Sequence, residues 1–245
     1  MKILAIVTAR MTSNRLPGKV LLKVKKKPFL QFLIERLKIV KKIDQIVIAT
    51  TINKTDDVLE RFAKKMKVKC FRGSEEDVMG RVVFAAKRFG ADIIVDVTGD
   101  CPIIDCDLVD QAIQVYLHNN NADYVNNNNI RSYPDGMDVQ VFSYKALKKS
   151  YKMTSCPLER EHVTLHIRKN PKIFNTINII APQSLYWPEL GLTLDQQEDY
   201  DFLKKIIECL YEKNPFFSCS DIINFLKSNK KLLKINSYVR RKGDS

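Results

Sequence analysis

Glycine, histidine and tryptophan are scarce in this chain, whose 245 residues include eight Gly, nine Pro, three His and one Trp. So little Gly and Pro excludes a collagen-like protein or a flexible linker. No hydrophobic run approaches the roughly 20 residues that a membrane-spanning helix requires, so we expect no membrane span. The first apolar run ends at Val7, and Arg10 and Arg15 follow without a small-residue cleavage site. This argues against a signal peptide and favours a cytoplasmic protein.

The cysteines show no sign of a zinc site or a disulfide framework. No Cys-x-x-Cys pair occurs among the six, and the three histidines do not fall at the spacing of zinc ligands. We therefore expect free thiols in a reducing compartment.

Basic residues outnumber acidic ones by 41 to 28, which gives a formal net charge of +13. This balance raises the alternative of a nucleic-acid-binding protein, whose affinity would fall steeply with salt. Much of the excess is local, in residues 23–27 and in residues 227–245, which end in a basic C-terminal tail at 231–245. Neither cluster is interleaved with the aromatic residues on which single-stranded bases stack. A solvated basic face is the better interpretation, and we expect no nucleic-acid partner.

Strand and helix patterns alternate four times in the first half of the chain. Apolar runs rich in β-branched residues predict strands at 2–8, 45–50, 68–71 and 91–97. Amphipathic patterns predict a helix opened by Pro28 and others at 56–65, 74–89 and 107–117. For the third helix, Ser74 is the expected cap, Asp77 its reciprocal partner and Gly90 the stop. This alternation predicts an α/β fold, with a Rossmann-like, mostly parallel sheet and flanking helices.

The second half is less regular, but we place it on the same sheet as one domain. It is expected to contain strands at 136–142 and 173–180 and a brief strand within the Asn-rich stretch 119–129. Helices are expected at 144–151, 158–168 and 197–211. The single domain spans 1–230 and precedes the tail.

The loop after the first strand is the first place to look for a site, because parallel sheets bind ligands beyond the carboxyl ends of their strands. Residues 8–19 read Thr-Ala-Arg-Met-Thr-Ser-Asn-Arg-Leu-Pro-Gly-Lys, which is neither a P-loop nor a Gly-x-Gly-x-x-Gly motif. Arg10, Arg15 and Lys19 nevertheless suit a polyphosphate, and Gly18 lets a backbone approach closely. On composition alone, a basic surface loop remains an equal alternative.

The order of these residues is more specific. Ala-Arg-x-x-Ser-x-Arg-Leu-Pro-Gly-Lys after an N-terminal strand resembles the nucleotide-binding loop of cytidylyltransferases that make CMP-activated sugar acids. The resemblance is to the spore coat polysaccharide biosynthesis protein SpsF type in particular, related to the CMP-Kdo and CMP-sialic acid synthetases. Five further segments resemble SpsF-type sequences in the same order: Phe71-Arg-Gly-Ser-Glu-Glu-Asp-Val, Thr98-Gly-Asp-Cys-Pro, Tyr133-Pro-Asp-Gly-Met-Asp-Val, Glu159-Arg-Glu-His-Val-Thr and Leu192-Thr-Leu-Asp-Gln-Gln-Glu-Asp-Tyr.

The resemblance implies a nucleotide-diphospho-sugar transferase (GT-A-like) fold and an activity. CMP would pass from CTP to a sugar acid or related small acceptor, with Mg²⁺ as cofactor and pyrophosphate released, for surface polysaccharide or glycan synthesis. The domain would have a nucleotide-binding half at about 1–118 and an acceptor-binding half at about 119–230. Such relatives are often dimers, which leaves a homodimer open.

The resemblance also implies roles for individual residues. Asp100 and Asp195 would be the metal ligands, since Mg²⁺ takes one or two carboxylates plus phosphate oxygens. The alternatives are helix caps, for which Asp105 is better placed than Asp100, whereas for Asp195 the cap remains open. The catalytic candidates are Arg10, Lys19 and Asp100. The nucleotide-binding candidates are Ala9, Arg10, Ser13, Arg15, Gly18, Lys19, Arg72, Ser74, Asp77 and Thr98.

Two departures from the family pattern limit what can be carried over. Thr98 stands where the Kdo enzymes have a Gln that contacts cytosine, so another nucleoside triphosphate remains an alternative to CTP. Asp195 is followed by Gln-Gln in place of Thr-Pro.

Charged residues of the second half are the candidates for acceptor binding, because an acceptor with carboxylate or hydroxyl groups needs Arg, His and acidic partners. His162 could also relay a proton, since its ordinary pKa lies near 6.5. These candidates are Arg131, Asp135, Asp138, Arg160 and His162.

A glycosyltransferase that uses a sugar nucleotide on the same fold is the main alternative. Asp105-Cys-Asp107 has the Asp-x-Asp form that such enzymes use for metal. The basic first loop favours a triphosphate instead, and only a nucleotidyltransferase would release pyrophosphate.

Overall fold

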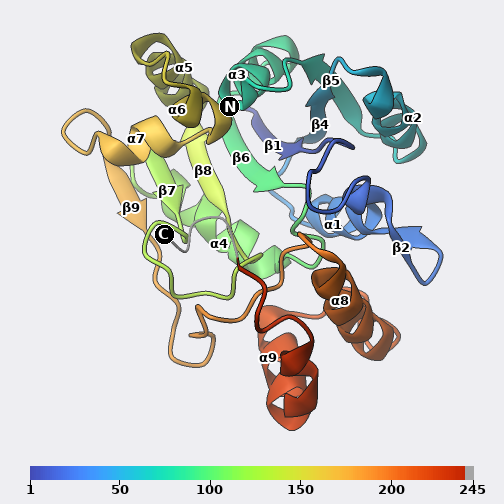
Figure 1. The fold of residues 1–245 in the computed structure, drawn as a ribbon. Helices are drawn as coiled ribbons and strands as arrows, with labels where there is room; N and C mark the ends of the chain where they lie inside the picture. The colour runs from blue at the N-terminus through green and yellow to red at the C-terminus, as the bar shows by residue number, and fades with distance from the viewer. Residues whose placement is uncertain (241–245) are drawn as a thin grey trace.

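A seven-stranded sheet with helices on both faces organises residues 1–240, the part that the computed structural model describes (Figure 1). The strand order is β5-β4-β1-β6-β8-β7-β9. All neighbouring strands are parallel except β8, which runs antiparallel to β6 and β7. The bounds are β1 Ile3–Thr8, β4 Gln45–Thr51, β5 Lys69–Gly73, β6 Ile93–Thr98, β7 Tyr124–Asn126, β8 Gln140–Ser143 and β9 Thr176–Asn178. The predicted mostly parallel sheet is thus confirmed.

The alternation of side chains along β1 divides the core into two layers. Ile3, Ala5 and Val7 pack on one face, against helices α1 (Phe29–Lys38), α2 (Asp57–Lys65) and α4 (Cys106–Leu117). Leu4 and Ile6 pack on the other, against α3 (Val78–Phe89), α5 (Tyr144–Met153) and α7 (Leu165–Lys169). Because both faces are covered, the strand is a continuous apolar run.

A further apolar cluster includes buried residues of α8 (Gln197–Leu210) and α9 (Cys219–Ser228). These two helices are drawn below the sheet in Figure 1. α9 was not predicted, although its buried residues have helical spacing. Ser218 and Asp221 form its capping box. A 3-10 helix, η3 (Lys230–Ile235), follows and joins the same cluster. The remaining elements are short: the 3-10 helices η1 (Lys19–Leu21) and η2 (Lys54–Asp56), the strands β2 (Lys23–Val24) and β3 (Lys27–Pro28), and the helix α6 (Pro157–Glu161).

Several predicted boundaries were wrong. Asp77, not Ser74, caps α3, and its carboxylate accepts a hydrogen bond from the Gly80 amide at 2.8 Å. The predicted helix at 158–168 is two short helices, α6 and α7. The predicted strand at 136–142 is reduced to β8, because Gly136 turns the chain with φ of +101° against the Leu192 backbone. Gly90 ends α3 as predicted, with φ of +70°.

The predicted tail lies partly inside the described residues, since η3 and the chain up to residue 240 are placed. Residues 241–245 of that tail lie outside them. Among residues 1–240, no helix is long and apolar enough to span a membrane.

Asp96, a fully buried carboxyl on β6, leads to a prediction about stability. Burial raises its pKa to about 7, although the charge of Arg81 acts in the opposite direction. The folded protein therefore keeps this proton up to about pH 7, whereas the unfolded chain loses it near pH 4. Stability from this group consequently falls as pH rises through that window.

We expect Asp96→Asn, which cannot ionise, to flatten this dependence. The variant should be more stable than the wild type at about pH 8, by about 1–3 kcal/mol, and nearly equal at acid pH. Urea unfolding at about pH 5 and about pH 8 measures the difference. Identical pH slopes in the two proteins would contradict the assignment.

Candidate active site

The side chains of three segments meet on the ammonium group of Lys19. Lys19 Nζ donates to Asp100 Oδ2 at 2.8 Å and to Asp195 Oδ1 at 2.9 Å. Lys19 opens η1 after Gly18, whose φ is +70°; Asp100 follows β6; and Asp195 precedes α8. The structure thus brings together three residues that lie up to 176 positions apart in the sequence.

The pKa values of Lys19 and Asp100 indicate that these two groups are charged at neutral pH. Burial acts to lower the pKa of Lys19, but the charges of Asp100 and Asp195 outweigh it and raise that pKa. Burial likewise acts to raise the pKa of Asp100, while the Lys19 charge and hydrogen bond hold it below its ordinary value. Each group is therefore kept ionised by its partners.

Arg15 adds a second cation, because its Nη2 lies 2.8 Å from Asp195 Oδ1. The four side chains balance two positive charges against two negative ones. A divalent cation could take the place of the basic side chains beside the two carboxylates, and the phosphates of a polyphosphate could take the place of the carboxylates beside Lys19 and Arg15.

Asp195 is not a helix cap, which was the alternative interpretation. The cap of α8 is Gln196, which forms a capping box with Asp199. Asp105 does cap α4 as predicted: it accepts from the Asp107 amide at 2.8 Å and from the Cys219 amide at 2.7 Å. Both Asp105 oxygens are thereby engaged, so Asp105-Cys-Asp107 serves helix capping.

Three of the predicted acceptor-binding residues lie together beside this cluster. Arg131 Nη1 is 2.9 Å from Asp135 Oδ1 and 3.6 Å from Asp138 Oδ2. Asp135 pairs through its backbone with the segment that leads to Asp195, donating to Leu190 O at 2.9 Å. Burial, with the neighbouring Asp135, raises the pKa of Asp138 to about 7.

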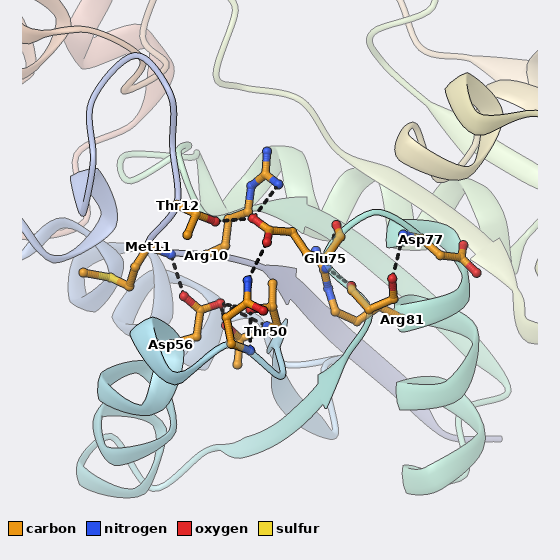
Figure 2. Close-up of polar contacts among 11 residues, drawn as sticks. Arg10, Met11, Thr12, Thr50, Asp56, Glu75, Asp77 and Arg81 are labelled. Atoms are coloured by element: carbon orange, nitrogen blue, oxygen red, sulfur yellow. Dashed lines mark hydrogen bonds and ion pairs between the residues drawn. The ribbon is translucent and has the colours of Figure 1, made fainter.

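Two carboxylates that the sequence analysis did not assign hold the first loop in place. Figure 2 shows Glu75 reached by Arg10, whose Nη1 donates at 3.1 Å, and by Thr12. Glu75 also accepts from Asn53, so it joins the loops after β1, β4 and β5. Glu75 lies within the SpsF-like segment that begins at Phe71, and this resemblance was the one sequence feature that could have identified it.

Asp56, also visible in Figure 2, is the second of these carboxylates. It accepts from the Met11 amide at 2.8 Å and from the hydroxyls of Thr50 and Thr51. Burial acts to raise its pKa, but these hydrogen bonds outweigh it and lower the pKa. The sequence pattern places Asp56 at the start of a helix, which is correct, but it does not reveal the contact with the first loop.

The other predicted residues lie outside the Lys19 cluster. Arg72 pairs with Asp57 at 2.7 Å and Glu60 at 3.1 Å on α2. Arg160 reaches Asp77 Oδ2 at 3.2 Å and stacks over the Tyr151 ring at 3.7 Å. His162 is exposed at the end of α6. Their binding roles, like those of Ala9, Ser13, Ser74 and Thr98 around the same sheet edge, stay predictions.

Asp100 and Asp195 could hold a metal ion together. Their oxygens already converge on one positive charge, that of Lys19. Within residues 1–240, no set of three or more His, Cys, Asp or Glu forms a metal-binding group. Two carboxylate oxygens suit Mg²⁺, which completes its shell with phosphate oxygens and waters.

Comparison with known proteins identifies the family. A family model described as cytidylyltransferase matches residues 4–240. The spore coat polysaccharide biosynthesis protein SpsF of Bacillus subtilis is 34% identical over 93% of this chain and 95% of its own length. An uncharacterized protein of Methanocaldococcus jannaschii is 38% identical over 99% of this chain and 97% of its own.

Solved structures agree with this assignment. A cytidylyltransferase from Leptospira borgpetersenii superposes with a TM-score of 0.90 at 36% identity, over 95% of this chain and 96% of that one. A CMP-2-keto-3-deoxy-manno-octonic acid synthetase in complex with CTP has a TM-score of 0.65 at 18% identity, over 85% and 99%, which shows the shared fold. The chain belongs to the cytidylyltransferase family and is a nucleotidyltransferase, as the SpsF-type segments of its sequence predicted.

Proposed function

We propose that this protein transfers CMP from CTP to a small hydroxyl-bearing acceptor, a sugar acid or a related molecule, in a magnesium-dependent reaction that releases pyrophosphate. The observation that carries the proposal is the convergence of Asp100 and Asp195 on Lys19 at the carboxyl edge of the sheet. The names of two relatives support it: one is a spore coat polysaccharide biosynthesis protein, and the other a synthetase complexed with CTP. A role in surface polysaccharide or glycan synthesis in the cytoplasm belongs to the same proposal.

In this reaction a hydroxyl oxygen of the acceptor attacks the α-phosphorus of CTP, the bond from that phosphorus to pyrophosphate breaks, and the hydroxyl proton passes to the solvent. Bound by Asp100 and Asp195, Mg²⁺ would supply charge neutralisation at the phosphates. Lys19 and Arg15 would hold the β- and γ-phosphates, with Arg10 beside them, and stabilise the leaving pyrophosphate. Positioning and charge neutralisation account for most of such catalysis.

The acceptor would lie against Arg131, Asp135 and Asp138. Arg131 can donate to a carboxylate, and the two aspartates can accept from hydroxyl groups. Since Asp135 is paired with the segment carrying Asp195, an acceptor bound there would be close to the phosphates.

Calorimetric titration with each of the four nucleoside triphosphates and Mg²⁺ tests the donor, with Asp100→Ala beside the wild type. We expect metal-dependent binding of CTP that the substitution weakens, and release of pyrophosphate once an acceptor is supplied. Binding of a sugar nucleotide, but of no triphosphate, would favour the glycosyltransferase instead.

Glu75→Ala is expected to raise the KM for CTP about tenfold, with a smaller effect on kcat. The substitution removes the group that holds Arg10, Thr12 and Asn53, so the free loop must be ordered when the nucleotide binds. Steady-state kinetics at saturating Mg²⁺ measures both constants. Glu76→Ala, at an exposed neighbouring carboxylate, is the matched control and should leave both unchanged. An unchanged KM in Glu75→Ala would show that the loop does not depend on Glu75.

A further inference from the structure

The segment after α9, which contains η3 and Asn236, returns to the side of the molecule that carries Asp195. Leu232, Leu233 and Ile235 of η3 pack on the apolar cluster that contains Leu194 and Phe202. The family match extends to residue 240 and so includes this segment.

Asn236 follows η3 and is almost completely buried, with 5% of its surface exposed. Its Nδ2 donates to Asp199 Oδ1 at 2.9 Å and to Gly191 O at 3.1 Å. One amide group therefore connects the start of α8 to the segment that precedes it.

Asp199 transmits this contact to the backbone of Asp195. Its other oxygen, Oδ2, accepts from the Asp195 amide at 3.1 Å and from the Gln196 amide at 3.0 Å. Because Asp199 is fully buried, its carboxylate is held by protein groups in place of water, and these donors are among them. Asn236 fixes one oxygen and thereby directs the other at the two amides.

The turn held in this way presents the Asp195 carboxylate to Lys19 and Arg15. A partner that orients a ligating group commonly changes metal affinity or activity 10- to 100-fold when it is removed. The contacts from Asn236 to Asp199 and from Asp199 to Asp195 are of this kind.

We propose that Asn236 is a positioning residue of the active site, which holds Asp199 so that the turn carrying Asp195 is set for the metal and nucleotide. The proposal rests on the proposed function, because it takes Asp195 as a metal ligand. Asn236 would thus support catalysis through Asp199, although it touches no reacting atom.

Asn236→Ala tests this with three measurements. The Mg²⁺ concentration for half-maximal CMP transfer should rise about tenfold, while the KM for acceptor at saturating Mg²⁺ stays within about twofold. Mn²⁺ binding in the presence of CTP, followed by electron paramagnetic resonance, should weaken about tenfold as well. In the ligand-free protein, amide exchange in residues 190–199 should become faster.

Two controls in the same segment separate positioning from general stability. Leu233→Ala removes packing and should lower Tm without changing Mn²⁺ affinity. Tyr238→Phe removes an exposed hydrogen bond to Glu198 and should change none of the measurements. Should Asn236→Ala fail to fold, Asn236→Ser serves in its place, since its short hydroxyl cannot reach both acceptors.

Wild-type amide exchange and Mn²⁺ affinity in the Asn236 variant would overturn the proposal. An equal loss of Mn²⁺ affinity in Leu233→Ala at equal Tm would overturn it too. A wild-type protein without metal-dependent CTP binding would refute the proposed function instead.

Discussion

Replacing Lys19 with alanine should lower kcat for CMP transfer about 100- to 1,000-fold while the protein remains folded. Lys19 is the cation shared by Asp100 and Asp195, and in the proposed reaction it is also the group that meets the charge on the leaving pyrophosphate. A loss of this size corresponds to one preorganised electrostatic contact in a site that excludes water. Steady-state kinetics with a pyrophosphate readout measures it.

The same substitution should change how the free protein responds to Mg²⁺. In the wild type, Lys19 holds the pKa of Asp100 below its ordinary value, which contributes stability above about pH 4 that is lost as pH falls. Without the ammonium, Asp100 loses its ion pair and Asp195 keeps only Arg15, so one cation is left for the two carboxylates and the variant should be less stable at neutral pH. Mg²⁺ alone should then raise the Tm of Lys19→Ala more than that of the wild type.

Lys41→Ala, at an exposed lysine, is the matched control for this pair of measurements and should match the wild type in both. Near-normal CMP transfer by Lys19→Ala would remove Lys19 from the reaction. If Lys19→Ala lowers kcat but its Tm responds to Mg²⁺ as the wild type does, Lys19 acts on the phosphates and does not compete with the metal for the two carboxylates.

The sequence predicted this cluster because of how parallel strands are arranged. β1 and β6 are apolar runs that end in polar residues, and their carboxyl ends necessarily meet at one edge of the sheet. Asp100 comes directly after β6 and Lys19 ends the loop that follows β1, so their proximity at this edge could be predicted. Asp195 follows no strand of the sheet, and only the family resemblance placed it there.

What could not be predicted depends on long side chains and on distant contacts. Arg72 pairs with Asp57 and Glu60, and Arg160 pairs with Asp77, but composition does not tell which carboxylate an arginine takes. Ser74 and Asp77 are both good helix caps three residues apart, and the backbone decided in favour of Asp77. Asn236 belongs to no motif, and its connection to Asp199 across 37 positions exists only in the folded chain.

Asp100→Asn and Asp195→Asn should each lower kcat at least about 100-fold and abolish the response of activity to Mg²⁺. Each variant keeps the shape of the side chain but removes the charge that a divalent cation requires. Because the two carboxylates act on one cation, the double variant should be little slower than either single one. Kinetics across a Mg²⁺ series, with all three variants, measures this non-additivity.

Asp107→Asn completes the comparison, because Asp107 is exposed on α4 and is the second aspartate of the Asp-x-Asp sequence. It should transfer CMP at the wild-type rate, with the wild-type dependence on Mg²⁺. If instead Asp107→Asn lost the metal response while Asp195→Asn kept it, the metal would belong to α4. The pairing of Asp100 with Asp195 through Lys19 would then be a structural ion pair, stabilising the sheet edge without a part in catalysis.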